Sequence, residues 1–189
     1  MRTAPRLLLP FILTALALTA CYEPLDYELV ITVDDAGGYE MSFDGTIGHL
    51  LLRDAQLHGA PEEHLSELRS EADAAIRNEP SVETSEYRED GVYYVRGKKA
   101  FSNTEAGVIF DFEFLGAQRL PGQLTFTTRV FDEDVRADYA EFGYEHDGHI
   151  ILRTGATILE SNGKRGPRGL YWDNELLQQE GMRITIATP

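Results

Sequence analysis

Side chains that bind metal ions or transfer protons are concentrated at two places in this 189-residue sequence. His146-Asp147-Gly148-His149 could bring two imidazoles together across a tight turn, with Glu145 or Asp147 as a third ligand. Asp132-Glu133-Asp134, followed by Asp138, offers carboxylate oxygens of the kind that calcium prefers. Zinc sites use three or four ligands, and an EF-hand loop needs a glycine and a terminal glutamate that the acidic cluster lacks. We therefore expect a hairpin tip and a solvated acidic turn here, with no metal and no cofactor.

Sequence signatures of the common enzyme classes are missing. The chain has no G-x-S-x-G elbow, no H-E-x-x-H motif, no P-loop and no dinucleotide fingerprint. Carboxylates are so numerous that the pattern marks no two of them as a buried catalytic pair. We expect no enzymatic activity, and a hydrolase is the least favoured of the functions considered below.

The single cysteine, Cys21, follows a short leader that has the parts of a secretory signal. Arg2 and Arg6 give the leader a positive start, and the uncharged stretch from Leu7 to Ala20 is too short to span a bilayer. The run Leu18-Thr19-Ala20-Cys21 resembles the lipobox of bacterial lipoproteins. That resemblance implies cleavage before Cys21 and a diacylglyceryl group, typically with palmitate, on its thiol. A plain secreted protein with an incidental cysteine is the alternative.

We accordingly divide the chain into a cleaved signal peptide (1–20), a lipidated cysteine with a short tether (21–26) and one globular domain (27–189). Five residues separate Cys21 from Tyr27 and span at most about 17 Å when extended, so the domain should lie close to the bilayer. Lipoproteins kept at the inner membrane of double-membraned bacteria typically have Asp after the cysteine. Tyr22 occupies that position. The expected location is therefore the cell envelope, outside the cytoplasm, with the periplasmic face of the outer membrane favoured in such a cell.

The charge of the chain is strongly negative, with 17 Lys and Arg against 32 Asp and Glu. The leader holds two arginines and no acids, which leaves 15 basic against 32 acidic residues and a net charge of −17 after cleavage. A surface this acidic repels nucleic acids and anionic lipids at long range, so we expect no nucleic-acid partner. Solubility or a saline habitat is a sufficient explanation for the excess.

Two clusters of cations stand out in this acidic chain. Lys164, Arg165 and Arg168 lie in the glycine-rich stretch 163–169, which we call the cation loop, and Arg96, Lys98 and Lys99 form the second cluster. Arginine forks and exposed backbone N–H groups bind phosphate and carboxylate groups. These six residues are candidate ligands of a lipid headgroup. An ordinary solvated turn that balances nearby acids is the simpler interpretation.

The hydrophobic pattern predicts an α+β domain, with a largely antiparallel, twisted sheet of six to eight strands and one main amphipathic helix packed on it. Residues 27–33 and 39–44 alternate around a Gly-rich turn and predict a hairpin, and Pro61 opens a helix that ends near Asn78. Further strands are expected within 82–96, 108–114, 124–131, 149–159 and 182–188, with a short helical turn within 132–141. Six aromatic residues could line a pocket between helix and sheet or simply fill the core: Tyr93, Phe110, Phe112, Phe114, Phe126 and Trp172.

Three segments of the mature chain resemble the LppM-like family of lipid-anchored envelope proteins known from mycobacteria. They are 26–29 running into 33–37, then 87–92 leading to Phe101-Ser102, and 160–163 followed by Trp172. The resemblance implies an α/β domain similar to lipid carriers that binds lipid or glycolipid. Some relatives also carry a C-terminal membrane helix, whereas this sequence ends at Pro189.

These observations lead to one main hypothesis and one alternative. The main hypothesis is a non-enzymatic, lipid-anchored envelope protein whose domain binds a lipid or amphiphile near the membrane. The alternative is an accessory module that docks an envelope protein complex through an exposed strand edge or an apolar patch.

Overall fold

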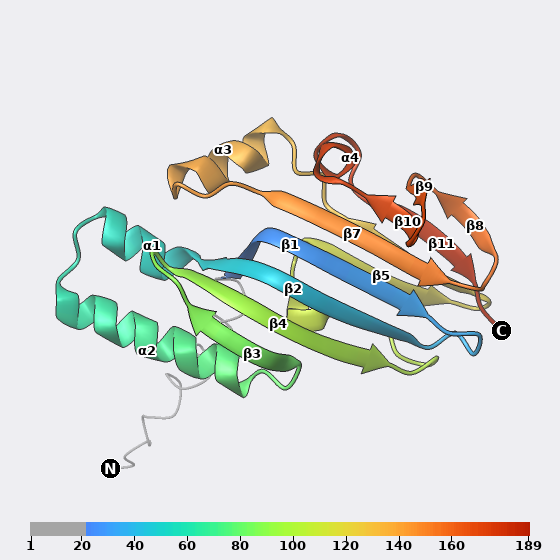
Figure 1. The fold of residues 1–189 in the computed structure, drawn as a ribbon, viewed down its shortest axis with the longest axis horizontal. Helices are drawn as coiled ribbons and strands as arrows, with labels where there is room; N and C mark the ends of the chain where they lie inside the picture. The colour runs from blue at the N-terminus through green and yellow to red at the C-terminus, as the bar shows by residue number, and fades with distance from the viewer. Residues whose placement is uncertain (1–21) are drawn as a thin grey trace, which may run out of the picture.

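The computed structural model describes residues 22–189, and the predicted signal peptide and Cys21 lie outside the described residues. The large sheet has seven strands in the order β3 (Val82–Tyr87), β4 (Val92–Phe101), β2 (Tyr39–His49), β1 (Tyr22–Val33), β7 (Asp147–Thr154), β10 (Gly169–Trp172) and β9 (Lys164–Gly166). The small sheet has four strands in the order β5 (Leu115–Leu120), β6 (Gln123–Thr128), β11 (Arg183–Ala187) and β8 (Ile158–Ser161). The helices are α1 (Leu50–Leu57), α2 (Glu62–Asn78), α3 (Glu133–Glu141) and α4 (Asn174–Gln179), with a 3₁₀ turn, η2, at Ile109–Asp111 (Figure 1).

The predicted α+β class is confirmed. Every neighbouring pair of strands is antiparallel except β1 and β7, which run parallel from the pair Asp26–Asp147 to the pair Val33–Thr154. The main sheet falls within the predicted size, and α3 forms where a helical turn was predicted, whereas the separate small sheet and the helices α1 and α4 were not predicted.

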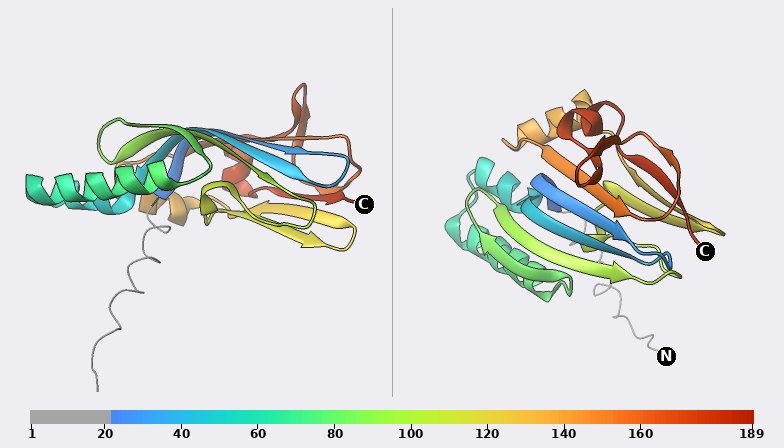
Figure 2. Two further views of the ribbon diagram at one scale, coloured as in Figure 1. Left: turned by 90° about the horizontal axis from the view of Figure 1, so that it is seen from below. Right: turned by 45° about the vertical axis from the view of Figure 1, so that its right-hand side comes forward.

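One face of the large sheet carries both the small sheet and α2 (Figure 2). Tyr39 of β2 meets Phe126 of β6 with ring centroids 5.0 Å apart, which joins the two sheets. On the same face, Ala72 and Ile76 of α2 are buried in the core that the two sheets share. This core is built from residues 22–189, so the segment has the hydrophobic interior that an independently folding domain needs.

The hairpin between β1 and β2 forms as its sequence predicts. Asp34 Oδ1 accepts hydrogen bonds from the backbone N–H groups of Ala36 (2.8 Å) and Gly38 (2.9 Å). Gly37 adopts a φ of 84°, which a residue with a Cβ rarely does. Helix α2 likewise begins directly after Pro61, with Glu62 and Glu63 in its first turn.

Three local expectations differ from the structure. Residues 147–149, expected at a hairpin tip, lie in strand β7 and pair with β1. Strand β1 begins at Tyr22, not at Tyr27, so residues 22–26 belong to the large sheet and do not form a tether. A β-bulge between Pro24 and Tyr27 interrupts the alternation there, and Pro24 and Leu25 are buried, which hid the strand from a period-two search. Residues 108–114 do not form a strand either, because η2 occupies their middle.

Candidate functional site

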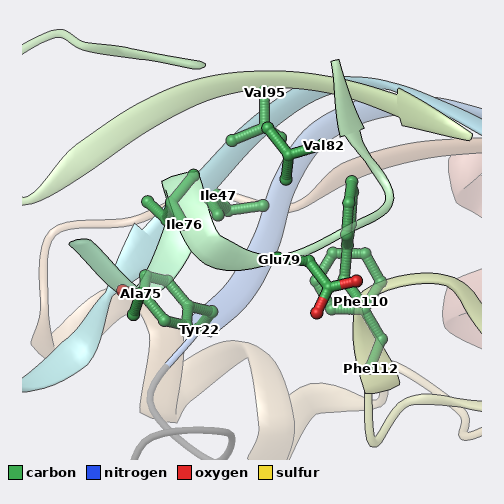
Figure 3. Close-up of a pocket in the computed structure, with 9 residues that line it drawn as sticks. All are labelled: Tyr22, Ile47, Ala75, Ile76, Glu79, Val82, Val95, Phe110 and Phe112. Carbon is green, nitrogen blue, oxygen red and sulfur yellow. The ribbon is translucent and has the colours of Figure 1, made fainter. Parts of the chain in front are cut away.

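A largely apolar cavity lies where α2 and the small sheet fail to meet on the shared face of the large sheet (Figure 3). We call it the α2 cavity, and its volume is about 120 Å³. Nine residues line it: Tyr22, Ile47, Ala75, Ile76, Glu79, Val82, Val95, Phe110 and Phe112. An apolar lining of this kind favours contact with the apolar part of a ligand.

Secondary structure explains why apolar side chains face this space. Ile47 and Val95 come from β2 and β4, on the face that points toward α2, and Ala75 and Ile76 come from the last turns of α2. Because Ala75 has a short side chain, the helix leaves room between itself and the sheet.

Glu79 is the one charged side chain among the described residues that line the cavity. Its Oε1 accepts a hydrogen bond from the backbone N–H of Ser81 (3.2 Å) and a short one from the Ser81 hydroxyl. Since Glu79 is also the residue that ends α2, the chain turn itself fixes this carboxylate beside the cavity.

Tyr22, the first residue of β1, lines one side of the cavity. The Tyr22 hydroxyl donates a hydrogen bond to the Ala72 carbonyl (3.2 Å), and the Tyr22 ring meets the His49 ring edge-on at 4.8 Å. Tyr22 also directly follows Cys21, the residue at which the sequence predicts a lipid.

Phe110 and Phe112 enter the cavity from the segment around η2. Phe110 and Asp111 have φ angles of 57° and 50°, in the left-handed region that residues with a Cβ seldom occupy. The Phe110 ring contacts the rings of Phe43 and Phe112, each with centroids 5.4 Å apart. The Phe110 ring also lies against Gly97, where an added Cβ would come within 2.7 Å of Cζ.

The six aromatic residues that could line a pocket or fill the core fall into two groups in the structure. Phe110 and Phe112 line the α2 cavity, whereas the other four fill the core with exposures of 2% or less: Tyr93, Phe114, Phe126 and Trp172. Sequence reasoning did not assign Tyr22, Glu79 or Val82 to the site. The apolar stripe of the predicted helix includes Ala75 and Ile76, and it was the feature of the sequence that indicated the side of the cavity formed by α2.

The six cations predicted to contact a headgroup lie away from the α2 cavity and in two separate places. Four strand spacings, or roughly 19 Å, separate β4 from β10 in the large sheet. Most of the six already have a partner: Arg96 with Asp44 (2.8 Å), Lys98 with Glu83 (3.5 Å), Lys164 with Asp173 (2.8 Å), Arg168 with Glu28 (2.8 Å), and Lys99 with the Phe101 ring (5.5 Å). Among the described residues, Arg165 has no acidic partner. The two clusters therefore do not converge on one site.

The cation loop does shape a second pocket of about 210 Å³, between the loop and β7. Ile151 and His149 contribute to it from β7, and Arg168 and Tyr171 contribute from the β9–β10 hairpin. Along β7 the core-facing residues are Ile150 and Leu152, so Ile151 points to the opposite face of the sheet. This pocket and the α2 cavity consequently lie on opposite faces.

The candidate metal ligands are dispersed. His146 is buried, whereas His149 is half exposed on β7. Asp132 caps α3 by accepting a hydrogen bond from the Val135 N–H (3.1 Å), which explains the acidic cluster as a helix start. Within residues 22–189, no group of three or more His, Cys, Asp or Glu side chains is placed to hold a metal ion.

A polar cluster lies next to Tyr22, at the start of β1. Arg129 Nη2 donates to Glu23 Oε2 (2.8 Å) and to the Tyr139 hydroxyl (3.1 Å), and that hydroxyl donates to the same carboxylate oxygen (2.5 Å). Burial raises the pKa of the Tyr139 phenol, and the nearby Glu23 carboxylate raises it further. The phenol therefore stays protonated and serves as a donor that ties α3 to β1.

Comparisons with known proteins give one structural likeness. The fold is similar to the NMR structure of the folded domain of LppM from Mycobacterium tuberculosis, with a TM-score of 0.42 and 14% sequence identity. The likeness covers 88% of this chain and 91% of that domain. No family model and no curated protein matches the sequence. Among residues 22–189, no helix is long and apolar enough to cross a membrane.

Proposed function

We propose that this chain is a lipid-anchored protein of the bacterial cell envelope whose domain binds the hydrocarbon part of a lipid or amphiphile in the α2 cavity. The observation that carries the proposal is the position of this cavity, because Tyr22 lines it and directly follows Cys21. A lipid on Cys21 would hold the domain at the membrane surface, where amphiphiles are concentrated.

The anchor places the domain outside the cytoplasm, on the periplasmic face of the outer membrane in a double-membraned cell. Strand β1 begins one residue after Cys21, so lipidation at that residue leaves almost no spacer between bilayer and domain. The acidic surface is repelled by anionic headgroups, and attachment then depends on the acyl chains. Two or more chains make such attachment stable, whereas one chain is marginal.

Native mass spectrometry of residues 22–189, purified gently from a bacterial host, tests amphiphile binding. We expect a population whose mass exceeds the bare chain by that of a bound lipid or fatty acid, and transfer of added lysophospholipid to the empty fraction. Only the bare mass, with no uptake, would refute the proposal.

A second candidate function is docking to an envelope protein complex. Leu120 on β5 and Leu159 on β8 are exposed by 50% and 51%, and both strands are edges of the small sheet. Exposed edges with apolar side chains are sites where another chain can add. Crosslinking in the native membrane tests this candidate: a specific partner attached near Leu120 or Leu159, together with no amphiphile uptake, would favour it over the first.

A further inference from the structure

The α2 cavity is too small for a complete lipid. Its volume of about 120 Å³ is slightly below the roughly 150 Å³ of an apolar protein cavity that accommodates benzene. Because benzene has six carbons, the cavity as it stands admits about five carbons of a hydrocarbon chain. A longer chain needs additional room inside the domain.

Phe110 occupies the place where that room would be found. Its ring lines the cavity on one side and rests on Gly97 on the other, where the strand has no side chain. Two ring contacts, with Phe43 and Phe112, hold it there, and its side chain is only partly buried. Removal of this benzene-sized ring would open a space comparable to the cavity itself, since an apolar protein cavity that accommodates benzene measures roughly 150 Å³.

The backbone around Phe110 favours such a movement. Phe110 and Asp111 both adopt left-handed φ angles, which disfavour residues with a Cβ. A shift of this short segment to ordinary backbone angles would relieve that strain while it withdraws the ring. The loss of two aromatic contacts opposes the shift.

We infer that Phe110 is a plug that one hydrocarbon chain displaces, so that the α2 cavity selects single-chain amphiphiles. This inference rests on the proposed function and specifies its ligand. The cavity and the space left by the ring together hold about ten carbons of one chain, and they leave no room for a second chain.

Charge at the cavity restricts the headgroup. Glu79 keeps a carboxylate beside the cavity, and Ser81 fixes its position. An anionic headgroup next to Glu79 would be repelled, in the same sense as by the acidic surface of the whole chain. The ligand that fits is therefore a single-chain amphiphile whose headgroup is zwitterionic, neutral or cationic.

A chain-length series of lysophosphatidylcholines tests the plug. Binding of chains of six to fourteen carbons to residues 22–189 would be measured by calorimetry below the micelle concentration. Each additional buried methylene is worth about fourfold in affinity, so the affinity should rise to about ten carbons and then level off. Phe110→Ala should bind every chain beyond five carbons about tenfold more tightly, because no aromatic contacts are then lost on entry.

Phe142→Ala, an equal truncation outside the cavity, serves as the matched control and should leave the series unchanged. Phe110→Leu replaces Phe110→Ala if the smaller side chain prevents folding, and it should shift the affinities in the same direction. Glu79→Gln should strengthen binding of anionic lysophosphatidylglycerol relative to lysophosphatidylcholine.

The outcomes separate the inference from the function on which it rests. If affinity is the same for all chains from six carbons upward and Phe110→Ala changes nothing, the plug is refuted while amphiphile binding stands. If no chain binds to the wild-type domain or to Phe110→Ala, the proposed function is refuted as well.

Discussion

Protonation of His146 should make the domain unstable in mild acid. The His146 side chain is 7% exposed and stacks on the Phe131 ring with centroids 3.7 Å apart. Its Nδ1 lies 3.2 Å from Asn174 Oδ1, and within residues 22–189 its Nε2 has no hydrogen-bond partner. Burial lowers the pKa of His146 to about 4, and the Arg129 charge adds to this effect, while Asn174 and Asp147 oppose it.

The direction and size of the effect follow from proton linkage. The pKa of His146 is lower in the folded state than its ordinary value of 6.5, so the unfolded chain binds this proton first as the pH falls. Stability is therefore full above the ordinary pKa and is lost progressively toward pH 4. The shift corresponds to about 3 kcal/mol in total, of which about 2 kcal/mol is lost between pH 7 and pH 5.

Urea denaturation of residues 22–189 between pH 7 and pH 4.5 measures this loss, with His146→Gln as the comparison. Glutamine keeps a polar group near Asn174 but does not titrate in this range. We expect the wild-type free energy of unfolding to fall by about 2 kcal/mol more than that of the variant between pH 7 and pH 5. In thermal unfolding, the corresponding extra loss is roughly 4 to 8 °C.

The comparison with the variant is needed because other groups titrate in the same range. His49 is also buried, with its Nδ1 accepting a hydrogen bond from the Leu52 N–H (3.0 Å), and burial lowers its pKa as well. Both proteins share the contribution of His49, so it cancels in the difference. Parallel stability profiles for wild type and His146→Gln would refute the reasoning, as would an NMR titration that places the folded His146 pKa near 6.5.

Three further predictions concern the anchor, the cavity and the polar cluster. Cys21→Ser in the full chain should abolish incorporation of a clickable palmitate analogue and partitioning into the detergent phase; normal labelling would contradict the proposed anchor. Ala75→Leu should fill part of the α2 cavity and weaken lysophosphatidylcholine binding at least tenfold in calorimetry, and unchanged affinity would place the ligand elsewhere. Glu23→Ala should cost about 2 kcal/mol in urea denaturation because it leaves the half-buried Arg129 without its acid. Glu28→Ala, which breaks an exposed ion pair, should cost less than about 1 kcal/mol, and equal losses would show that burial does not set the difference.

Much of the fold could be predicted because its main elements have regular hydrophobic periods. The helix beginning after Pro61 and the hairpin around Gly37 follow directly from residue spacing and turn chemistry. The large sheet has a size within the predicted range. In the small sheet, β11, the start of β8 and all of β6 but its first residue fall within predicted strand segments, although their separation into a second sheet was not predicted. Strand β5 escaped prediction because it buries little of its alternation, with Leu115 as its one fully buried position.

The segment 108–114 shows why an apolar alternation does not determine a strand. Phe110, Phe112 and Phe114 are spaced as in a strand, yet Phe110 and Asp111 turn the chain through left-handed angles. No glycine marks that turn, and only Asp111 is of a residue type that tolerates left-handed angles, so the local sequence gives a weak sign of it. The reason lies elsewhere in the chain, because Gly97 leaves the space into which the Phe110 ring packs.

The sequence left open whether six aromatic residues line a pocket between helix and sheet or fill the core. The structure divides them, because two of the six line the α2 cavity and the other four lie in the core. The cations of the cation loop were expected to bind a lipid headgroup. Arg168 instead pairs with Glu28, and the loop lies on the opposite face of the sheet from the α2 cavity. The spacing of residues in the sequence does not reveal which face of a sheet a hairpin covers. The cation loop and the α2 cavity lie on opposite faces of the large sheet, so their separation could not be predicted.

The cavity itself is a consequence of how the sheet is covered. Helix α2 and the small sheet share one face, but the helix ends at Asn78 and its short Ala75 side chain does not reach the aromatic residues at η2. The segment around Phe110 bridges this gap with one ring, held in a backbone conformation that costs energy. Replacement of Ala75 by a larger residue would fill the gap and add apolar contacts with the Phe110 ring, so the proposed ligand and a larger helix side chain would compete for the same space.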